Sequence, residues 1–433
     1  MKVKPDFKKL TVSKFSVIFY WLLIIALLGL FFTNDFGLVD IHKTAIISAV
    51  GIDTEDGEVL VTCEVAVPQP SQSGDNIKYT QIQGSGLTIA DAMNEVNSKT
   101  GFYPKLQFCR LVLVGESCKD VQLFRLLGCF YRKNYSELTA LVAMCKGKAS
   151  EMLSYKSPVS DMTSETIRKC ISEEIEKSAN AVTVNLKDIA SLQFSKNKAC
   201  YMPYVEANIP GTSESGGNGE NVGGESGGQS QGGQGGQSGG QSQGGGGEGG
   251  SQSQGGASGQ SQQGEQTEFT AARTAVFADG MFKTFLDEKQ TLALNLLKGD
   301  LDFVSLPFDT EDKHYSFRLK NTDGGIGLKI ENGVPKVSLK FKAKANVQGA
   351  REIVNPSDNI DDDVVPEAVL KAAEEEVKGR FINLMDVSRR EQCDFLGLKD
   401  ILFKFNYKYY DAMNAVLLDR AEVMPEVNIG SIN

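Results

Sequence analysis

The sequence predicts an α+β protein with mixed or antiparallel sheets and packed helices, in two or three extracytoplasmic domains, plus one N-terminal transmembrane helix. Three observations predict this class. Residues 15–32 form an uncharged apolar run, a Gly/Ser/Gln-rich tract occupies residues 211–268, and β-branched runs alternate with amphipathic stretches on both sides of that tract. Each flanking segment, 34–210 and 269–433, is long enough to bury a hydrophobic core.

The apolar run predicts a membrane anchor over residues 15–33. No charge lies between Phe15 and Phe32, and a helix of this length spans roughly 27 Å, close to the hydrocarbon thickness of a bilayer. Lysines precede the run and acids follow it, so residues 1–14 should form a basic cytoplasmic tail. The exit, LFFTN, lacks the small residues that signal peptidase requires. We therefore expect an uncleaved anchor, with a cleaved, atypical signal peptide as the alternative.

The composition excludes several classes of partner and cofactor. The formal net charge is −10, and no basic patch with interleaved aromatic residues occurs, which excludes a nucleic-acid binder. The eight cysteines have no C-x-x-C spacing, and the chain has two histidines. We therefore expect buried thiols that pack like apolar side chains, ahead of disulfides or a metal cluster, and we expect no cofactor.

The tract has almost no apolar side chain, as in GGQSQGGGGEGGSQSQGG. Such a composition cannot bury enough surface to offset the entropy of ordering, so the sequence predicts a disordered coil. About fifty residues of this kind have a root-mean-square span near 40 Å. The tract should therefore act as a tether or a surface insertion between the two flanking segments.

The segment before the tract predicts alternating strands and helices. Residues 44–67 form a hairpin around Asp56-Gly57, and a helix begins at its cap Thr88 and ends at Gly101. A buried strand at 110–114, a helix at 119–131, a strand at 138–145 and a helix at 161–178 should follow. A last strand around Val205 precedes the tract.

The segment after the tract begins with a hairpin at 271–286 that turns at Asp279-Gly280, and a helix over 287–299 closes at Gly299. Strands at 301–308, 314–321, 326–332 and 335–347 should then be separated by turns at NTDGG and NGVP. A long helix should begin at Pro366. The acids at 361–363 suit its positive end, with cation binding as the alternative.

The sequence offers no catalytic constellation. His42 lies next to the membrane and His314 lies in an expected strand, so neither belongs to a nucleophilic motif. The run DGGIG after Thr322 resembles a phosphate loop superficially, but no helix opens after it, and a turn explains its glycines. We therefore expect that the protein is not an enzyme.

Seven stretches in order resemble one known family. They are TAIISAVGID, GSGLTIADAMNEVNSKTG, KLQFCRLVLVGE, ELTALVAMCKGKASEML, YMPYVEANIP, RTAVFADGMFKTFLDEKQTLALNLLKGD and CDFLGLKDILFKF. Together they are similar to the Ger(x)C proteins, the C subunits of spore germinant receptors. The resemblance covers nearly all of the chain outside the anchor and the tract.

This resemblance implies a non-enzymatic subunit on the outer face of the spore inner membrane. It would act with an A subunit and a polytopic B subunit in a complex that senses small-molecule nutrients and triggers ion release. An independent extracytoplasmic solute-binding module is the alternative, and it would require a well-formed pocket. A surface hydrolase is a more distant one. The positions that match the family are expected to be structural, at turns, strand ends and helix stops, with partner contact as the alternative: Gly51, Asp53, Gly115, Pro203, Asp394 and Gly397.

The sequence departs from the family in two places. The tract is an unusual insertion, and we expect it to loosen any fixed geometry between the two flanking segments. Family members usually carry a lipid on a cysteine, and counting back without gaps from Gly51 places that position on Asp35. A carboxylate cannot form the thioether. We therefore expect a peptide helix to replace the acyl chain.

Overall fold

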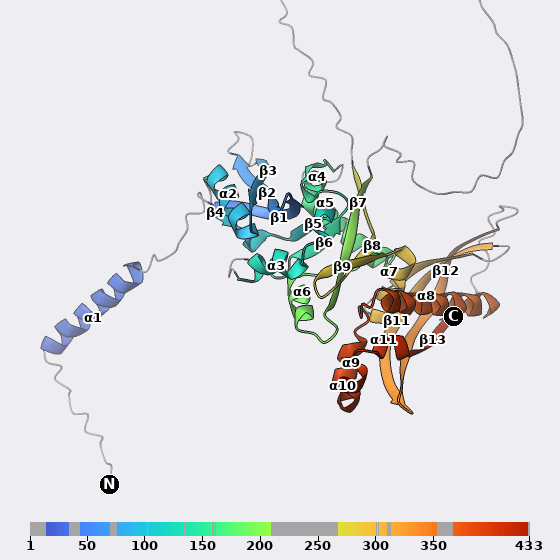
Figure 1. Cartoon of the computed structure of the whole chain (residues 1–433). Coiled ribbons are helices and arrows are strands. Elements are labelled where there is room, and N and C mark those ends of the chain that lie inside the picture. The colour runs from blue at the N-terminus through green and yellow to red at the C-terminus, as the bar shows by residue number, and fades with distance from the viewer. Residues whose placement is uncertain are drawn as a thin grey trace, which may run out of the picture.

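The computed structural model describes residues 14–33, 44–69, 76–101, 103–132, 136–157, 160, 162–208, 267–299, 301, 303–309, 313–352 and 367–431. Five sequence-based expectations lie wholly or largely outside these residues. They concern the basic tail at 1–14, Asp35, His42, the tract at 211–268, which is described only at 267 and 268, and the acidic run at 361–363 with Pro366. Two sheets with packed helices make up the described protein beyond its N-terminal helix, which confirms a mixed α+β fold (Figure 1).

The first sheet is mixed and has the strand order β3-β2-β1-β5-β6-β7-β8-β9, with the short β4 pairing β1. Strands β1, β5, β6 and β7 run parallel in its centre, and antiparallel strands flank them. Parallel strands are covered on both faces, and their apolar runs reflect this. The bounds are β1 (Thr44–Glu55), β2 (Glu58–Gln69), β3 (Asn76–Gly86), β4 (Tyr103–Lys105), β5 (Leu111–Gly115), β6 (Leu141–Cys145), β7 (Ala199–Asn208), β8 (Glu268–Ala278) and β9 (Met281–Leu286).

Helices cover both faces of this sheet. One core gathers α2 (Ile89–Thr100), α3 (Leu123–Arg132) and α6 (Leu186–Gln193) with the 3₁₀ turns η2 (Leu106–Phe108) and η3 (Glu116–Cys118). The opposite core contains α4 (Ala149–Ser154) and α5 (Thr163–Lys177). The expected hairpin turn is confirmed, because Asp56 and Gly57 both have positive φ. The cap of α2 is also confirmed, since the Thr88 hydroxyl accepts from the Asp91 amide and Gly101 is left-handed.

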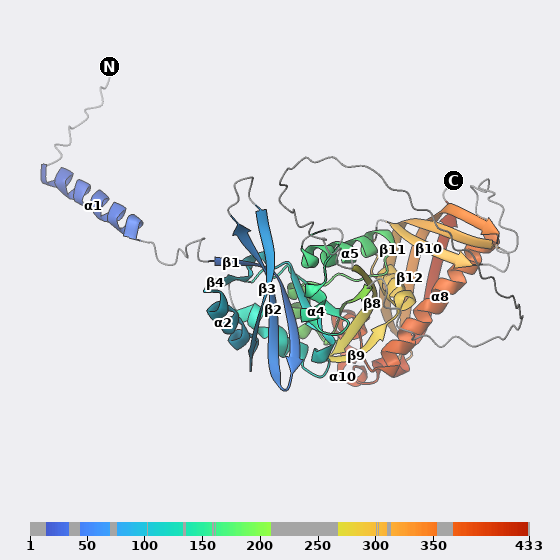
Figure 2. The same ribbon diagram turned by 90° about the horizontal axis from the view of Figure 1, so that it is seen from above.

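The second sheet has the order β10-β11-β12-β13, with β13 parallel to β12. Its strands are β10 (Phe303–Asp309), β11 (Lys313–Glu331), β12 (Val334–Glu352) and β13 (Glu422–Ser431). The long helix α8 (Glu367–Arg390) runs along it, as Figure 2 shows, and buries Ala373, Val377 and Phe381 as its periodicity predicts. The C-terminal region also contains α9 (Leu398–Phe405), η4 (Tyr407–Tyr409), α10 (Tyr410–Met413) and α11 (Leu417–Arg420).

The expected turn at NTDGG is wrong. Residues 313–331 form the single strand β11, and the register with β12 shifts between Lys320 and Asp323. This shift is a bulge, and Gly324 allows it to pack closely, because a Cβ at Gly324 would lie 2.0 Å from the Leu296 carbonyl oxygen. Gly324 therefore serves the close approach of α7 (Glu288–Lys298) and not a chain reversal.

The two flanking segments share the first sheet, so the expectation of a loosened geometry between them is wrong. Strand β7, before the tract, pairs with β8, after it, from Ala199 opposite Ala278 to Asn208 opposite Glu268. The helix α7 then joins the two sheets, because residues 291–297 are all buried. Its Asn295 side-chain amide donates to the Ala179 and Ala181 carbonyls, at 2.6 and 2.5 Å.

The expected anchor coincides with a helix, α1 (Lys14–Thr33). Figure 1 draws it at the N-terminal end of the chain. Judged on the side chains that the structure describes, no helix is both long and apolar enough to cross a bilayer.

Candidate functional site

Three of the family-motif positions meet at the start of α4. Asp53 lies in β1, is 1% exposed, and accepts hydrogen bonds from two backbone amides. The Ala149 amide donates to its Oδ1 at 2.8 Å and the Ser150 amide donates to its Oδ2 at 3.0 Å. Helix N-termini leave amides without intrahelical partners, and a carboxylate also suits the positive end of the dipole. Asp53 therefore ties a central strand to a helix far along the chain.

Two glycines make room for this contact. A Cβ at Gly115 would lie 2.0 Å from Asp53 Oδ1 and 3.1 Å from the Ala149 amide nitrogen. A Cβ at Gly51 would lie 3.1 Å from both the Ala149 Cβ and the Leu153 Cδ1. Gly115 is extended, with φ −68°, so it is required for space and not for a left-handed conformation. Any side chain at Gly115 would push against the buried carboxylate.

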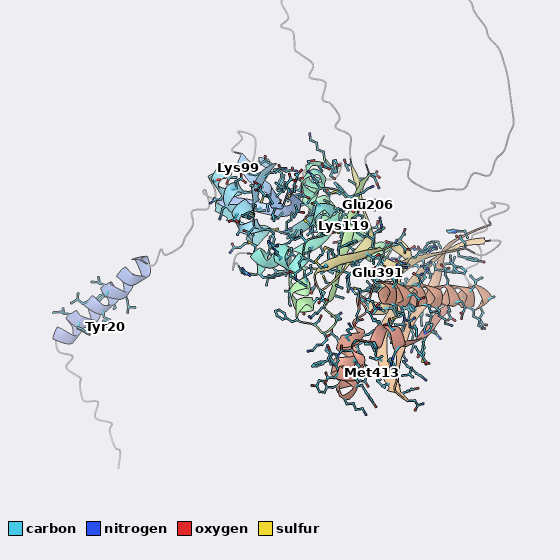
Figure 3. All side chains as sticks on the ribbon, viewed as in Figure 1. Tyr20, Lys99, Lys119, Glu206, Glu391 and Met413 are labelled. Carbon is cyan, nitrogen blue, oxygen red and sulfur yellow. The ribbon has the colours of Figure 1, made fainter. Side chains whose placement is uncertain are left out.

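A polar junction continues from Gly115 toward the segment after the tract. The Glu116 carboxylate accepts from the Tyr204 hydroxyl at 2.9 Å, the Lys119 ammonium at 2.6 Å and the Gly147 amide at 3.1 Å. Burial opposes ionisation, but these hydrogen bonds together hold the pKa of Glu116 below its usual value. Lys119, labelled in Figure 3, also lies 4.7 Å from the ring centre of Phe285 in β9. This junction therefore bridges both sides of the tract.

Two more of the family-motif positions, Asp394 and Gly397, form a second cap at the start of α9. Asp394 is 2% exposed, and its carboxylate accepts from the Leu398 amide at 2.8 Å and the Lys399 amide at 2.7 Å. Gly397 has φ 78°, so it supplies the left-handed turn between them. Burial raises the pKa of Asp394 to about 6, although the two amides oppose that shift.

Pro203 lies apart from both caps. It is in β7 opposite Thr274 of β8, and the parallel pairing with β6 begins one residue later, at Tyr204. Proline has no amide hydrogen, so this position costs no ladder bond to β6. The structure thus joins Gly51, Asp53 and Gly115 at α4 and joins Asp394 and Gly397 at α9. Pro203 lies within β7 of the first sheet, apart from both groups.

The described side chains hold few groups arranged for catalysis. His314 Nδ1 lies 2.5 Å from Asp309 Oδ1, and both side chains are exposed on neighbouring strands. Within the described part of the chain, no three His, Cys, Asp or Glu side chains cluster as metal ligands would. No disulfide joins the eight cysteines, all of which the structure describes, and six of them are buried. Burial raises the pKa of Cys109 and Cys200 to about 12, so these thiols stay neutral.

Several open clefts occur on the described surface. One lies between the start of α7 and the middle of α8, where the Gln290 side-chain amide donates to Asn383 Oδ1 at 2.8 Å. Lys289 and Arg380 also line it. A second, beside β5 and β6, includes Phe108, Arg110 and Arg168. Some of the polar side chains that line these clefts already have partners: Arg168 pairs with the nearby Glu165 at 2.8 Å.

Two family models match the chain, one on each side of the tract. Residues 38–207 match the family described as "Spore germination protein N-terminal domain". Residues 272–429 match the family described as "Spore germination B3/ GerAC like, C-terminal". The chain belongs to the Ger(x)C family of spore germination proteins. The resemblance that the sequence carries is thereby confirmed.

Two further comparisons add less. A solved chain titled "Crystal Structure of the GerBC protein" is similar, with a TM-score of 0.48 and 14% identity over 91% of this chain and 100% of that one. No curated protein matches this chain.

The two Ger(x)C regions meet inside one sheet. The N-terminal match ends at residue 207, within β7, and the C-terminal match begins at residue 272, within β8. These two strands are antiparallel neighbours. The expected boundary at residues 268–269 therefore does not coincide with a boundary between sheets. In this Ger(x)C chain, β8 and β9 of the C-terminal region complete the sheet of the N-terminal region.

Sequence reasoning missed a third buried carboxylate of the same kind. Glu64 in β2 is 3% exposed and accepts from the Ser164 hydroxyl and from the Ser48 hydroxyl, the latter at 2.7 Å. The Ser164 amide, in the first turn of α5, also points at it, at 3.4 Å. A charged residue within an apolar alternating strand was the available signal, because such a residue is rarely buried without a partner.

Proposed function

We propose that this Ger(x)C protein is a non-catalytic, membrane-anchored subunit of a spore germinant receptor complex, in which nutrient sensing triggers germination. The observation that carries the proposal is the ordered match of both family regions, over residues 38–207 and 272–429. In this proposal an A subunit and a polytopic B subunit are the partners. The family descriptions name germination and no reaction, which supports a role through assembly.

The arrangement of buried carboxylates supports the non-catalytic part of the proposal. Asp53, Glu64 and Asp394 accept backbone amides at helix starts, so their oxygens are engaged in holding the fold. A catalytic carboxylate would need an accessible oxygen beside a substrate. We infer that the family-motif positions act as structural supports, and that the surface they hold rigid contacts the partner subunits.

We propose that α1 anchors the protein in the spore inner membrane, with residues 1–14 in the cytoplasm and the two Ger(x)C regions on the outer face. The support is the uncharged run from Phe15 to Phe32 together with the helical conformation of Lys14–Thr33, which makes a helix of about 30 Å. Asp35 stands where the resemblance places the lipidated cysteine. A peptide anchor therefore replaces the lipid.

Purification of the full chain from spore membranes tests the complex. We expect an affinity-tagged chain, solubilised in mild detergent, to bring down a polytopic membrane protein. A version lacking residues 15–33 serves as the control, because it separates partner binding from shared residence in the membrane. If the intact chain brings down no polytopic partner and instead binds an amino acid or sugar directly, the solute-binding alternative replaces the receptor subunit.

Intact-mass measurement of the membrane-extracted protein tests the anchor. The expected mass is that of the whole chain from its first residue, without diacylglycerol. A mass corresponding to the loss of residues 1–34 with an added lipid would overturn the peptide anchor, and would leave the receptor proposal standing.

A further inference from the structure

An exposed aromatic segment remains that neither the caps nor the proposed complex explains. Residues 403–410, FKFNYKYY, form the end of α9, η4 and the start of α10, and we call them the aromatic tip. Phe405 is 77% exposed and Tyr407 is 66% exposed. Helices α9 and α10 project at one end of the molecule in Figure 1, and Figure 3 places Met413 of α10 at the same end.

Contacts with β11 and α9, and contacts between its own rings, hold the aromatic tip in place. The Asn406 side-chain amide donates to the Leu328 carbonyl of β11 at 3.2 Å, and its backbone amide donates to the Leu402 carbonyl at 2.9 Å. The Phe403 ring meets the Tyr407 and Tyr410 rings edge to face, at 5.2 and 5.1 Å between centres. Because these contacts order the segment in advance, little conformational entropy is lost when the exposed rings meet a partner.

A neighbouring loop adds a ring and a cation to the same surface. The Lys196 ammonium lies 4.4 Å from the Phe403 ring centre, and the Lys196 amide donates to Asp400 Oδ1 at 2.7 Å. Phe194, two residues earlier, is 85% exposed. The loop between α6 and β7 therefore lies against α9 at Lys196, and the exposed Phe194 ring is part of the same loop.

The charged residues on this surface indicate which kind of partner it binds. Lys404 and Lys408 are exposed within the aromatic tip, and the acids of the flanking turns are Asp400 in α9 and Asp411 in α10. Protein interfaces are enriched in aromatic residues and Arg and depleted in Lys, and residues 398–413 combine aromatic rings with lysines and contain no arginine. Aromatic rings that alternate with lysines are instead typical of the bilayer interface, where rings enter the headgroup level and lysine stems extend to anionic phosphates.

We propose that the aromatic tip docks on the headgroup region of an anionic phospholipid bilayer, as a contact separate from α1. Phe405 and Tyr407 enter the interface, and Lys404, Lys408 and Lys196 face lipid phosphates. The docked surface holds the second sheet at the membrane, where α1 alone would leave its orientation open.

A single reporter tryptophan tests the docking in the full chain. Trp21 is the only tryptophan, so Trp21→Phe removes the background and Phe405→Trp places a reporter on the aromatic tip. Phe108→Trp, at a ring that is 54% exposed beside the first sheet, is the matched control. Each protein is reconstituted into phosphatidylcholine vesicles with or without phosphatidylglycerol, and brominated lipids serve as quenchers.

In vesicles with phosphatidylglycerol we expect the Phe405→Trp emission to shift to shorter wavelength and to be quenched, and the Phe108→Trp emission to stay unquenched. Adding Lys404→Gln or Lys408→Gln should lower the ratio of docked to undocked protein about fivefold per lysine. Equal quenching at both reporters would overturn the proposal. So would quenching of Phe405→Trp that appears only when other spore-membrane proteins are added, because a protein would then be the partner.

Vesicle flotation separates this test from the anchor. If the protein floats with the vesicles in high salt and the Phe405→Trp reporter stays unquenched at low salt, docking fails and the anchor stands. If the protein leaves the vesicles in high salt and the reporter is quenched at low salt, the anchor fails and docking stands.

Discussion

The caps of α4 and α9 use the same chemistry and are built in opposite ways. Asp53 reaches α4 from a strand far back in the sequence, whereas Asp394 reaches α9 from four residues before it. The glycine beside Asp53, Gly115, provides space, and the glycine beside Asp394, Gly397, provides a left-handed backbone. The comparison teaches that a buried aspartate can either join distant segments of a fold or complete a local turn.

Removing the long-range carboxylate should have the largest effect. Asp53→Ala removes the acceptor of two amides at the start of α4, one buried and one half-buried, and hydrogen bonds to a charged group contribute about 2 kcal/mol each. We expect the free energy of unfolding to fall by about 4 kcal/mol, measured by urea denaturation of the full chain in detergent. Glu151→Ala on the exposed side of α4 is the control, with an expected loss of about 0.5 kcal/mol. Similar losses for the two variants would contradict the joining role of Asp53.

Filling the space beside Asp53 should have the next largest effect. Gly115→Ala places a methyl group against Asp53 Oδ1, and we expect a loss of about 3 kcal/mol. In an Asp53→Ala background the same change should cost only about 1 kcal/mol, because the clashing oxygens are gone. A double-mutant cycle measures this coupling. Strictly additive losses would show that Gly115 matters for another reason.

The stability that Asp394 contributes at the cap of α9 should depend on pH. The pKa of Asp394 is raised from 3.8 to about 6, so the folded state binds a proton between these values when the unfolded state does not. Stability from this group is therefore fully present below about pH 4 and is lost as the pH rises through 6, by roughly 3 kcal/mol. The difference in unfolding free energy between the wild type and Asp394→Asn should follow that course. A difference that is constant from pH 4 to 7 would contradict it.

The smallest effect is expected at the left-handed glycine. Gly397→Ala meets no clash, because the nearest atom, Asn197 Nδ2, lies at 3.9 Å, so its cost is conformational and about 1 kcal/mol. Gly379→Ala in α8 meets open space and has helical backbone, so we expect it to raise the free energy of unfolding by about 0.8 kcal/mol. If backbone conformation determines the effect, thermal unfolding will show the melting temperatures of the two variants shifted in opposite directions. Shifts of the same sign would contradict this account.

What the sequence could predict follows the same division between local and distant contacts. The hairpin turns at Asp56-Gly57 and Asp279-Gly280, the caps of α2 and α7, and the buried face of α8 depend on neighbours in the chain, and the structure confirms them. The meeting of Gly51, Asp53 and Gly115 at α4 depends on sheet order, which periodicity does not encode. The short helices α4 and α6 were missed for a related reason, because six and eight residues give too little periodicity.

The bulge in β11 shows where a correct local signal was misinterpreted. Glycines at NTDGG indicate a position that needs special backbone or close packing, and a turn is the commoner cause. The cause here is the approach of Leu296 and Leu297 in α7 to Gly324, a contact that only the packing of the second sheet creates. The family motif at Asp394 and Gly397 was recognisable because its parts lie within a few residues.

The pairing of Asn208 with Glu268 changes what the length of the tract can mean. Both ends of the tract are held at neighbouring strand positions, about 5 Å apart. For a flexible coil, the conformation that the composition of the tract predicts, the entropic cost of closure grows only with the logarithm of length, so doubling the tract would cost about 0.6 kcal/mol. Whole Gly/Ser/Gln repeats can therefore be gained or lost during evolution with almost no effect on folding. Tract length is free to drift, or to be selected for reach alone.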